Sequence, residues 1–262
     1  MIQAALGSLV IVLGVTIAFS TVLRVLVDAR LRAQADEYWS LIERDPANPV
    51  LPETDLVHGY FLRPGVPDVP TVFQIDRLRD GRSFATRRVT AIQHGKVIFF
   101  CAASFQEEEA GAEHQLSMPE VPAPEDIEPQ DPLPAEVLAT LPVKVQRWLD
   151  RSGPFEFRHV YPRDELKPPK RPPFQQMWFR LTGPVGDAPV LHRALLAYAS
   201  DFQLLGTATF PHGISYYQPN VQMASLDHAL WFHRPFRVDD WLLYSLDSPS
   251  AQGARGLARG QI

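Results

Sequence analysis

A tetrapeptide of the form Phe-x-Arg-Pro occurs twice in this sequence, at Phe61 to Pro64 and at Phe232 to Pro235. In each half an aspartate follows the arginine by thirteen residues, at Asp76 and at Asp247. A serine and then an arginine-bearing strand come next in both halves, at Ser83 with Arg87 and Arg88 and at Ser250 with Arg255 and Arg259. Matching motifs at matching spacing indicate an internal duplication. The chain is therefore expected to fold as two copies of one supersecondary unit.

The first copy has the pattern of an antiparallel meander. Its segments are rich in β-branched and aromatic residues, which favour strands. The turn signals Pro64-Gly65, Asp80-Gly81 and His94-Gly95 separate these segments. We expect four strands, at Gly59 to Leu62, Thr71 to Leu78, Ser83 to Gln93 and Lys96 to Phe105.

The second copy adds an apolar helix, expected at Val190 to Leu205, to a set of strands. A sheet that wraps around one hydrophobic helix buries the apolar surfaces of both. No counterpart of the strand Lys96 to Phe105 follows in this copy, so we expect it to lack its last strand and to expose a sheet edge. The expected strands are Phe155 to Tyr161, Gln175 to Thr182, Val221 to Phe232, Trp241 to Asp247 and Ala254 to Ile262.

An acidic, proline-rich stretch separates the two copies and contains Glu107-Glu108-Glu109 and many prolines. Such a composition buries little and is typical of a linker. The expected division of the chain is an atypical helical segment at residues 1–57, a partial first domain at 58–106, the linker at 107–153 and a second domain at 154–262.

The N-terminal segment Ala4 to Leu23 carries no charge and is long enough to cross a bilayer core as a transmembrane helix. No basic region precedes it, which disfavours a cleavable signal peptide, and Arg24, Arg30 and Arg32 after it favour a cytoplasmic remainder. A helix buried inside the globular fold is the alternative, and both interpretations stay open. The sequence does not end in Ser-Lys-Leu, so this signal gives no support for peroxisomal import.

Composition narrows the classes of function. A hydrophobic content of 45% is sufficient for a substantial core, and a net charge of -5 without a basic cluster disfavours a nucleic-acid partner. The single cysteine, Cys101, forms neither a disulfide framework nor a cysteine-based metal site. The sequence contains no His-Glu-x-x-His motif and no Gly-x-Ser-x-Gly motif, so we expect no metal, no cofactor and no serine-hydrolase triad.

One acidic residue, Asp201, lies inside the most apolar run of the second half, Leu195 to Leu205. A carboxylate among apolar neighbours is costly unless it is paired, hydrogen-bonded or used in chemistry. Ser225 begins an aromatic-rich strand further along the chain. The functional interpretation rests on these two segments, although a serine at the start of a strand is common. The alternative role for Asp201 is to satisfy backbone groups or to pair with an arginine.

Several motifs resemble those of acyl-CoA thioesterase II, the double hot-dog hydrolases, in the same order: Val57 to Gly65, Arg79 to Phe84, Ala103 to Gln106, Ala197 to Asp201, Leu226 to Pro235 and Ser250 to Arg255. The resemblance implies an α+β fold of two tandem hot-dog domains, each a curved antiparallel sheet around a helix. Residues 1–57 lie outside the resemblance, and we expect an extra apolar helix there. The resemblance also implies hydrolysis of fatty acyl-CoA to fatty acid and CoA. In this family a carboxylate, a hydroxyl and a glutamine activate a water molecule.

The carboxylate of this family falls on Asp201 and the hydroxyl on Ser225, whereas the glutamine lies in a final strand that has no counterpart here. The alternative function is a catalytically silent acyl-CoA or lipid-binding module, tethered to a membrane by residues 4–23. Acyl-CoA is the expected substrate partner, and the unpaired sheet edge favours a homo-oligomer. The preferred acyl chain length depends on tunnel shape, which the sequence does not define.

Overall fold

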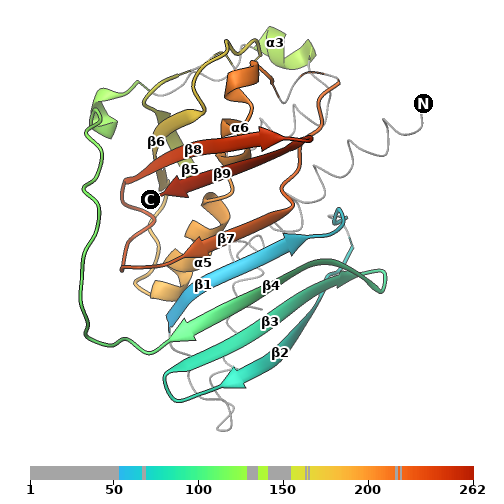
Figure 1. Ribbon diagram of the computed structural model, residues 1–262, viewed down its shortest axis with the longest axis vertical. Coiled ribbons are helices and arrows are strands. Elements are labelled where there is room, and N and C mark those ends of the chain that lie inside the picture. Colours follow the sequence, from blue (N-terminus) through green and yellow to red (C-terminus); the bar gives the residue numbers. More distant parts are fainter. Residues whose placement is uncertain are drawn as a thin grey trace. The chain divides into compact units, whose positions relative to one another are not determined.

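The computed structural model describes residues 53–66, 69–128, 135–140, 155–162, 164, 166–215, 218 and 220–262 (Figure 1). These residues form two compact units. The first unit includes the described residues up to Ala112, together with 188–198 and 224–236, and the second includes those of 113–187, 199–223 and 237–262. The helix expected at Ala4 to Leu23 lies outside the described residues. Within the described part of the chain, no helix is long and apolar enough to cross a membrane.

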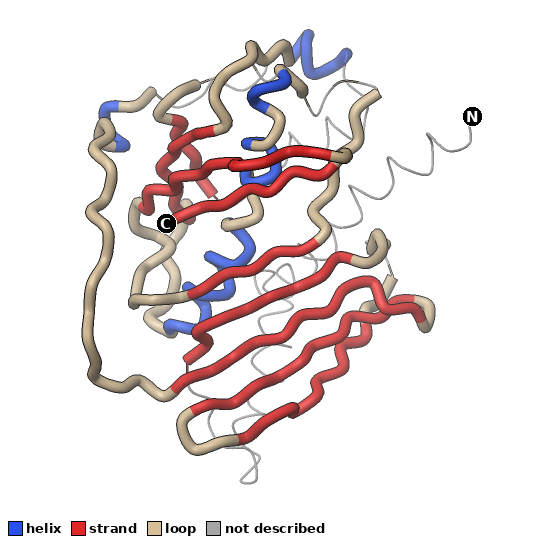
Figure 2. Tube along the Cα trace, viewed as in Figure 1, coloured by secondary structure: helices blue, strands red, loops and turns tan. Residues whose placement is uncertain are grey.

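The first unit is built on a five-stranded antiparallel sheet in the order β2-β3-β4-β1-β7 (Figure 2). Its strands are β1 (Glu53–Phe61), β2 (Val72–Asp80), β3 (Phe84–Gln93), β4 (Lys96–Gln106) and β7 (Asp227–Trp231). The four strands expected in the first copy are confirmed, although β1 begins earlier than predicted. His94 and Gly95 both have positive φ angles, of 49° and 69°, as a tight hairpin between β3 and β4 requires. Phe61, Ala91, Ile98 and Phe99 form the buried cluster of this sheet.

Strand pairing reflects the duplication. β1 and β7 pair antiparallel with His58 opposite Ala229, and each of these residues lies three positions before the Phe of its copy of the motif. The repeated aspartates also have matching partners in their own units. Asp76 accepts a hydrogen bond from Arg88 at 2.9 Å, and Asp247 accepts one from Arg259 at 2.9 Å. The Asp–Arg pair therefore recurs across corresponding pairs of strands, β2 with β3 in the first unit and β8 with β9 in the second.

The second unit contains a four-stranded antiparallel sheet in the order β5-β6-β8-β9. Its strands are β5 (Phe155–His159), β6 (Phe174–Leu181), β8 (Leu242–Gln252) and β9 (Arg255–Gln261), and its short helices are η1 (Pro124–Asp126), α3 (Ala135–Thr140), α6 (Leu204–Thr207) and η2 (Phe210–His212). α6 packs on β8 and β9. The strands expected in the second copy are present, and β8 is longer than predicted. β7 starts at Asp227 instead of Val221 and pairs in the sheet of the first unit.

The prediction of one helix from Val190 to Leu205 is wrong in its last third. α5 (Pro189–Ala199) ends at Ala199, a turn follows, and α6 begins at Leu204. The physical reason is the backbone of Gln203, which has a φ of 63° in the left-handed region and cannot continue a right-handed helix. Asp201 therefore lies in a turn and not within a helix.

β6 is buried on both of its faces, which explains why its sequence does not alternate between apolar and polar residues. On one face, Met177 and Phe179 are fully buried in the core of the unit. On the other face, the indole Nε1 of Trp178 donates a hydrogen bond to the carbonyl oxygen of Pro122 at 2.9 Å. Pro124 is itself buried. Part of the stretch expected to be a linker thus lies against this sheet.

Candidate active site

Asp201 is half-buried in the four-residue turn that joins α5 to α6. The amide of Phe202 donates a hydrogen bond to the carbonyl oxygen of Ala199 at 3.0 Å, which closes the turn after the helix. Gln203 then reverses the chain through its left-handed conformation and precedes the first residue of α6. The candidate base is thus carried by irregular backbone between two helical segments.

Side chains from two strands hydrogen-bond to this turn. The hydroxyl of Tyr244, on β8, donates to the carbonyl oxygen of Ser200 at 2.6 Å. The amide nitrogen of Gln175, on β6, donates to the carbonyl oxygen of Gln203 at 3.0 Å and to the Thr207 hydroxyl at 2.7 Å. Tyr244 and Gln175 are only 3% and 2% exposed. The carbonyls on both sides of Asp201 therefore have buried partners.

Aromatic rings surround the turn within the second unit. Phe202 packs edge-on against Phe157 with ring centroids 5.8 Å apart, and Phe157 stacks on Phe179 at the same separation. Phe179 in turn meets the ring of Tyr244 edge-on at 6.0 Å. The turn that carries Asp201 therefore adjoins an aromatic cluster through the next residue, Phe202.

The pKa of Tyr244 is affected by the nearby Asp201 carboxylate. Burial raises the pKa of the Tyr244 phenol far above its usual 10, and the negative charge of Asp201 raises it further. Tyr244 is therefore neutral at physiological pH and keeps the proton that it donates to the Ser200 carbonyl. The Asp201 carboxylate is near enough to act on this ring electrostatically.

Ser225, the second candidate, is half-buried and lies two residues before β7, in the first unit. The next residue, Leu226, anchors this segment because its carbonyl oxygen accepts a hydrogen bond from the amide of Phe61 at 3.0 Å. Asp201 belongs to the second unit. The structure therefore defines the local setting of each candidate within its own unit.

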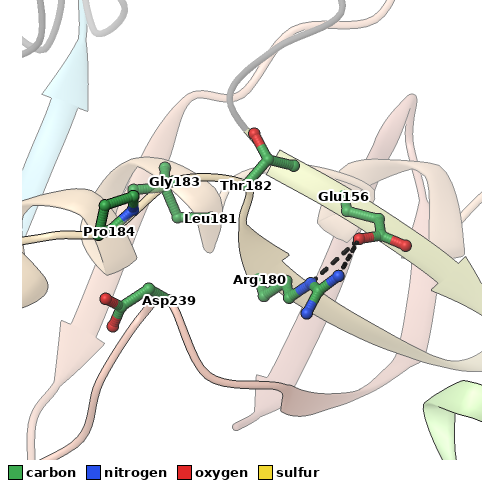
Figure 3. A pocket seen from close by; sticks show the side chains of 7 residues that line it. All are labelled: Glu156, Arg180, Leu181, Thr182, Gly183, Pro184 and Asp239. Carbon is green, nitrogen blue, oxygen red and sulfur yellow. Dashed lines mark hydrogen bonds and ion pairs between the residues drawn. The ribbon is translucent and has the colours of Figure 1, made fainter.

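An open pocket of about 360 Å³ lies elsewhere in the second unit (Figure 3). It is lined by Glu156, Arg180, Leu181, Thr182, Gly183, Pro184 and Asp239, and includes neither Asp201 nor Ser225. Burial raises the pKa of Glu156, but hydrogen bonds from Arg158 and Arg180 outweigh it and leave that pKa below its usual value. Both arginines also lie over the ring of Trp241. Since its charges are already paired, this pocket offers no obvious catalytic group.

Among the residues that the structure describes, no group of three or more His, Cys, Asp and Glu side chains could hold a metal ion. Sequence reasoning missed the two strand residues that contact the turn. A signal was present, because Gln175 and Tyr244 are polar residues in the mainly apolar segments Phe174–Leu181 and Leu242–Leu246. Like Asp201, a polar side chain among apolar neighbours is costly unless it is hydrogen-bonded.

Two family models match this chain. The acyl-CoA thioesterase family matches residues 152–262, and the acyl-CoA thioesterase N-terminal domain matches residues 40–106.

Named relatives agree with these matches. Acyl-coenzyme A thioesterase 8 of Mus musculus is 42% identical over 79% of this chain, and acyl-CoA thioesterase 2 of Haemophilus influenzae is 39% identical over 81%. The chain spans 66% of the length of the mouse protein and 76% of that of the bacterial protein.

Solved structures show the same likeness. Acyl-CoA thioesterase II TesB2 of Mycobacterium marinum superposes with a TM-score of 0.69 at 41% identity, covering 95% of this chain and 83% of that one. A protein described as having a hot dog fold, from Alicyclobacillus acidocaldarius, superposes with a TM-score of 0.55 at 17% identity, covering 82% of this chain and 73% of that one. The second likeness concerns the fold alone. Antiparallel sheets with a helix thus form a hot-dog fold here.

Proposed function

The chain belongs to the acyl-CoA thioesterase family, and on this premise we propose that it hydrolyses fatty acyl-CoA thioesters to free fatty acid and CoA. The observation that carries the proposal is the setting of Asp201, a half-buried carboxylate beside aromatic rings on a turn with buried hydrogen-bond partners. A carboxylate accepts hydrogen bonds from water and can take up a proton from it. A base of this kind is what water activation requires.

In the proposed reaction, the Asp201 carboxylate takes a proton from a water molecule while the water oxygen attacks the thioester carbonyl carbon. A tetrahedral intermediate forms, and its C–S bond then breaks. CoA leaves as a thiolate and receives the proton from Asp201, which regenerates the carboxylate. Because a thiolate is a good leaving group, the reaction needs no covalent enzyme intermediate.

We assign the Ser225 hydroxyl an auxiliary role in this reaction. A hydroxyl both donates and accepts hydrogen bonds, so it can orient the attacking water or donate to the oxygen on which negative charge develops. Ser225→Ala is expected to lower kcat but to leave residual hydrolysis, because the base remains. A kcat equal to that of the wild-type chain would contradict this assignment.

The decisive experiment replaces Asp201 with asparagine, which keeps the size and shape of the side chain but removes the base. General-base catalysis contributes about 10²–10⁴-fold, so Asp201→Asn is expected to lower kcat by that factor. Thiol release from medium- and long-chain acyl-CoA is the assay. Asp187→Asn is the matched control, because the side chain of Asp187 is 97% exposed. Hydrolysis by Asp201→Asn at the wild-type rate would refute the role of Asp201.

A binding assay run beside the kinetics tests the hydrolase against a binding module. The proposed hydrolase binds acyl-CoA and releases thiol, and Asp201→Asn still binds acyl-CoA with a similar Kd. Tight binding by the wild-type chain without any thiol release would contradict hydrolysis and would assign a carrier function instead.

Two predictions about partners also belong to this proposal. Contact with a membrane through residues 4–23 predicts that the chain needs detergent for extraction, and a deletion of those residues provides the control. A homo-oligomer predicts a sedimentation coefficient above that of a 29.5 kDa monomer. Extraction without detergent would contradict membrane contact, and a monomeric sedimentation coefficient would contradict a homo-oligomer.

A further inference from the structure

We propose that Tyr244 and Gln175 are positioning residues, which hold the turn containing Asp201 in a single conformation and thereby fix the direction of its carboxylate. This inference rests on the proposed role of Asp201 as the base. Neither residue is assigned contact with substrate. Their action is on the two backbone carbonyls that flank Asp201, those of Ser200 and Gln203.

The backbone of the turn is closed by the hydrogen bond from Phe202 to Ala199, and three features make further support necessary. The last carbonyls of a helix have no partners within the helix, and the end of α5 therefore depends on other groups. α6 has only four residues, which is too short to be stable alone. Gln203 also adopts a left-handed conformation that is unfavourable for a side chain of its type. Such a conformation persists only where surrounding contacts impose it.

Tyr244 holds the first half of the turn from a rigid position. Its ring meets Phe179 edge-on, and its other side lies against Gly260 of β9. A Cβ atom at position 260 would lie only 2.2 Å from Cε2 of Tyr244, so the ring occupies the space that a side chain there would need. The short hydrogen bond of 2.6 Å from this ring to Ser200 therefore has little freedom.

Gln175 holds the second half of the turn. Both hydrogens of its amide nitrogen are committed, one to the carbonyl of Gln203 and one to the Thr207 hydroxyl. Its Oε1 is buried and has no hydrogen-bond partner among the described residues. A buried amide oxygen without a partner is unfavourable. The reverse orientation would place this oxygen against the Gln203 carbonyl, so the amide is fixed with its nitrogen toward the turn.

The consequence for catalysis follows from geometry. A general base acts from about 2.6–3.2 Å, and a misplacement of about 1 Å can cost 10²-fold in rate. Loosening the turn is therefore expected to lower kcat by about 10–100-fold. KM is expected to change less than twofold, because neither side chain is assigned substrate contact. A purely structural role would leave kcat unchanged in folded protein.

The test uses Gln175→Met and Tyr244→Phe, which remove the hydrogen bonds with little change in side-chain volume. Gln176→Met is the control, because Gln176 neighbours Gln175, is also buried and points to the opposite face of β6, where its amide donates to Ser245 Oγ at 3.2 Å. Amide hydrogen exchange at Phe202 reports opening of the turn. We expect exchange at least about tenfold faster in both test variants and unchanged exchange in the control.

Kinetics and exchange together separate the outcomes. Faster exchange with a lower kcat and an unchanged KM supports the inference, whereas wild-type exchange in both variants overturns it whether or not the chain is active. Faster exchange with wild-type kcat also overturns it. If the wild-type chain does not hydrolyse acyl-CoA, amide hydrogen exchange at Phe202 alone decides whether Tyr244 and Gln175 hold the turn. Wild-type activity in Asp201→Asn would instead remove the proposed function, so the two failures are distinguishable.

Discussion

Gly260→Ala tests how tightly the core beside the candidate base is packed. The new Cβ would lie 2.2 Å from Cε2 of Tyr244 and 2.9 Å from both Cζ and the phenol oxygen. Nonbonded carbon atoms prefer about 3.5–4.0 Å, so the ring or strand β9 must move by more than about 1 Å. Either displacement disturbs the 2.6 Å hydrogen bond from Tyr244 to Ser200.

The expected cost combines two effects. Overpacking a core by one methyl group costs about 1–3 kcal/mol, and leaving a buried carbonyl without its donor costs a further 1–3 kcal/mol or so. Replacing glycine by alanine also stabilises a protein by about 0.4–1 kcal/mol, because the unfolded chain becomes less flexible. Since β9 is an outer strand of its sheet and can yield, we expect a net loss of about 1–4 kcal/mol in the free energy of unfolding.

The assay is urea unfolding followed by tryptophan fluorescence. Gly111→Ala is the control, because no atom lies within 4 Å of the Cβ that it would add. It should be neutral or slightly stabilising. In a Tyr244→Leu background the smaller side chain leaves room at position 260, so the cost of Gly260→Ala should fall by about 1–3 kcal/mol. Equal stability of Gly260→Ala and Gly111→Ala would refute the packing argument.

Three further predictions concern other parts of the chain. Hydrogen bonds from Arg237 lower the pKa of Asp239 to about 2, so this carboxylate stabilises the fold above pH ~4 and loses that effect as the pH falls towards 2. Unfolding midpoints measured from pH 5 to 2 should fall less steeply in Asp239→Asn, and identical slopes would contradict the assignment. Burial raises the pKa of the Cys101 thiol to about 11, so at pH 8 it should react with iodoacetamide far more slowly in folded protein than in urea, as mass spectrometry can show. Trp178→Phe removes the hydrogen bond to Pro122 and should speed cleavage of that segment by a glutamate-specific protease, whereas an unchanged cleavage rate would mean that other contacts hold the segment.

Much of the strand pattern could be predicted from the sequence, because local signals define it. The meander from β2 to β4 is bounded by Asp80-Gly81 and His94-Gly95, and turn chemistry of this kind acts within a few residues. The duplication was also visible, since it depends only on repeated spacing. β1 extends earlier than predicted because it pairs with both β4 and β7, and pairing with distant strands is not encoded in the local pattern.

The break between α5 and α6 could not be predicted for the same reason. The run from Val190 to Leu205 is rich in Leu and Ala and contains no proline or glycine, so its local propensity favours one continuous helix. The left-handed backbone of Gln203 interrupts it, and the turn that contains Gln203 is hydrogen-bonded to Tyr244 and Gln175, which lie far away in the sequence. Tertiary contacts override local propensity where they satisfy backbone groups that the helix would otherwise satisfy.

This interruption explains why Asp201 lies where it does. In a continuous helix its carboxylate would project from a regular surface, and its direction would depend on side-chain rotamers alone. In the turn, two buried side chains hydrogen-bond to the backbone on both sides of it, and the next residue, Phe202, packs against Phe157. Functional groups on irregular segments are effective when a rigid scaffold supports those segments. Gln175 on β6 and Tyr244 on β8 therefore have a physical role, because they donate hydrogen bonds to backbone carbonyls on both sides of Asp201.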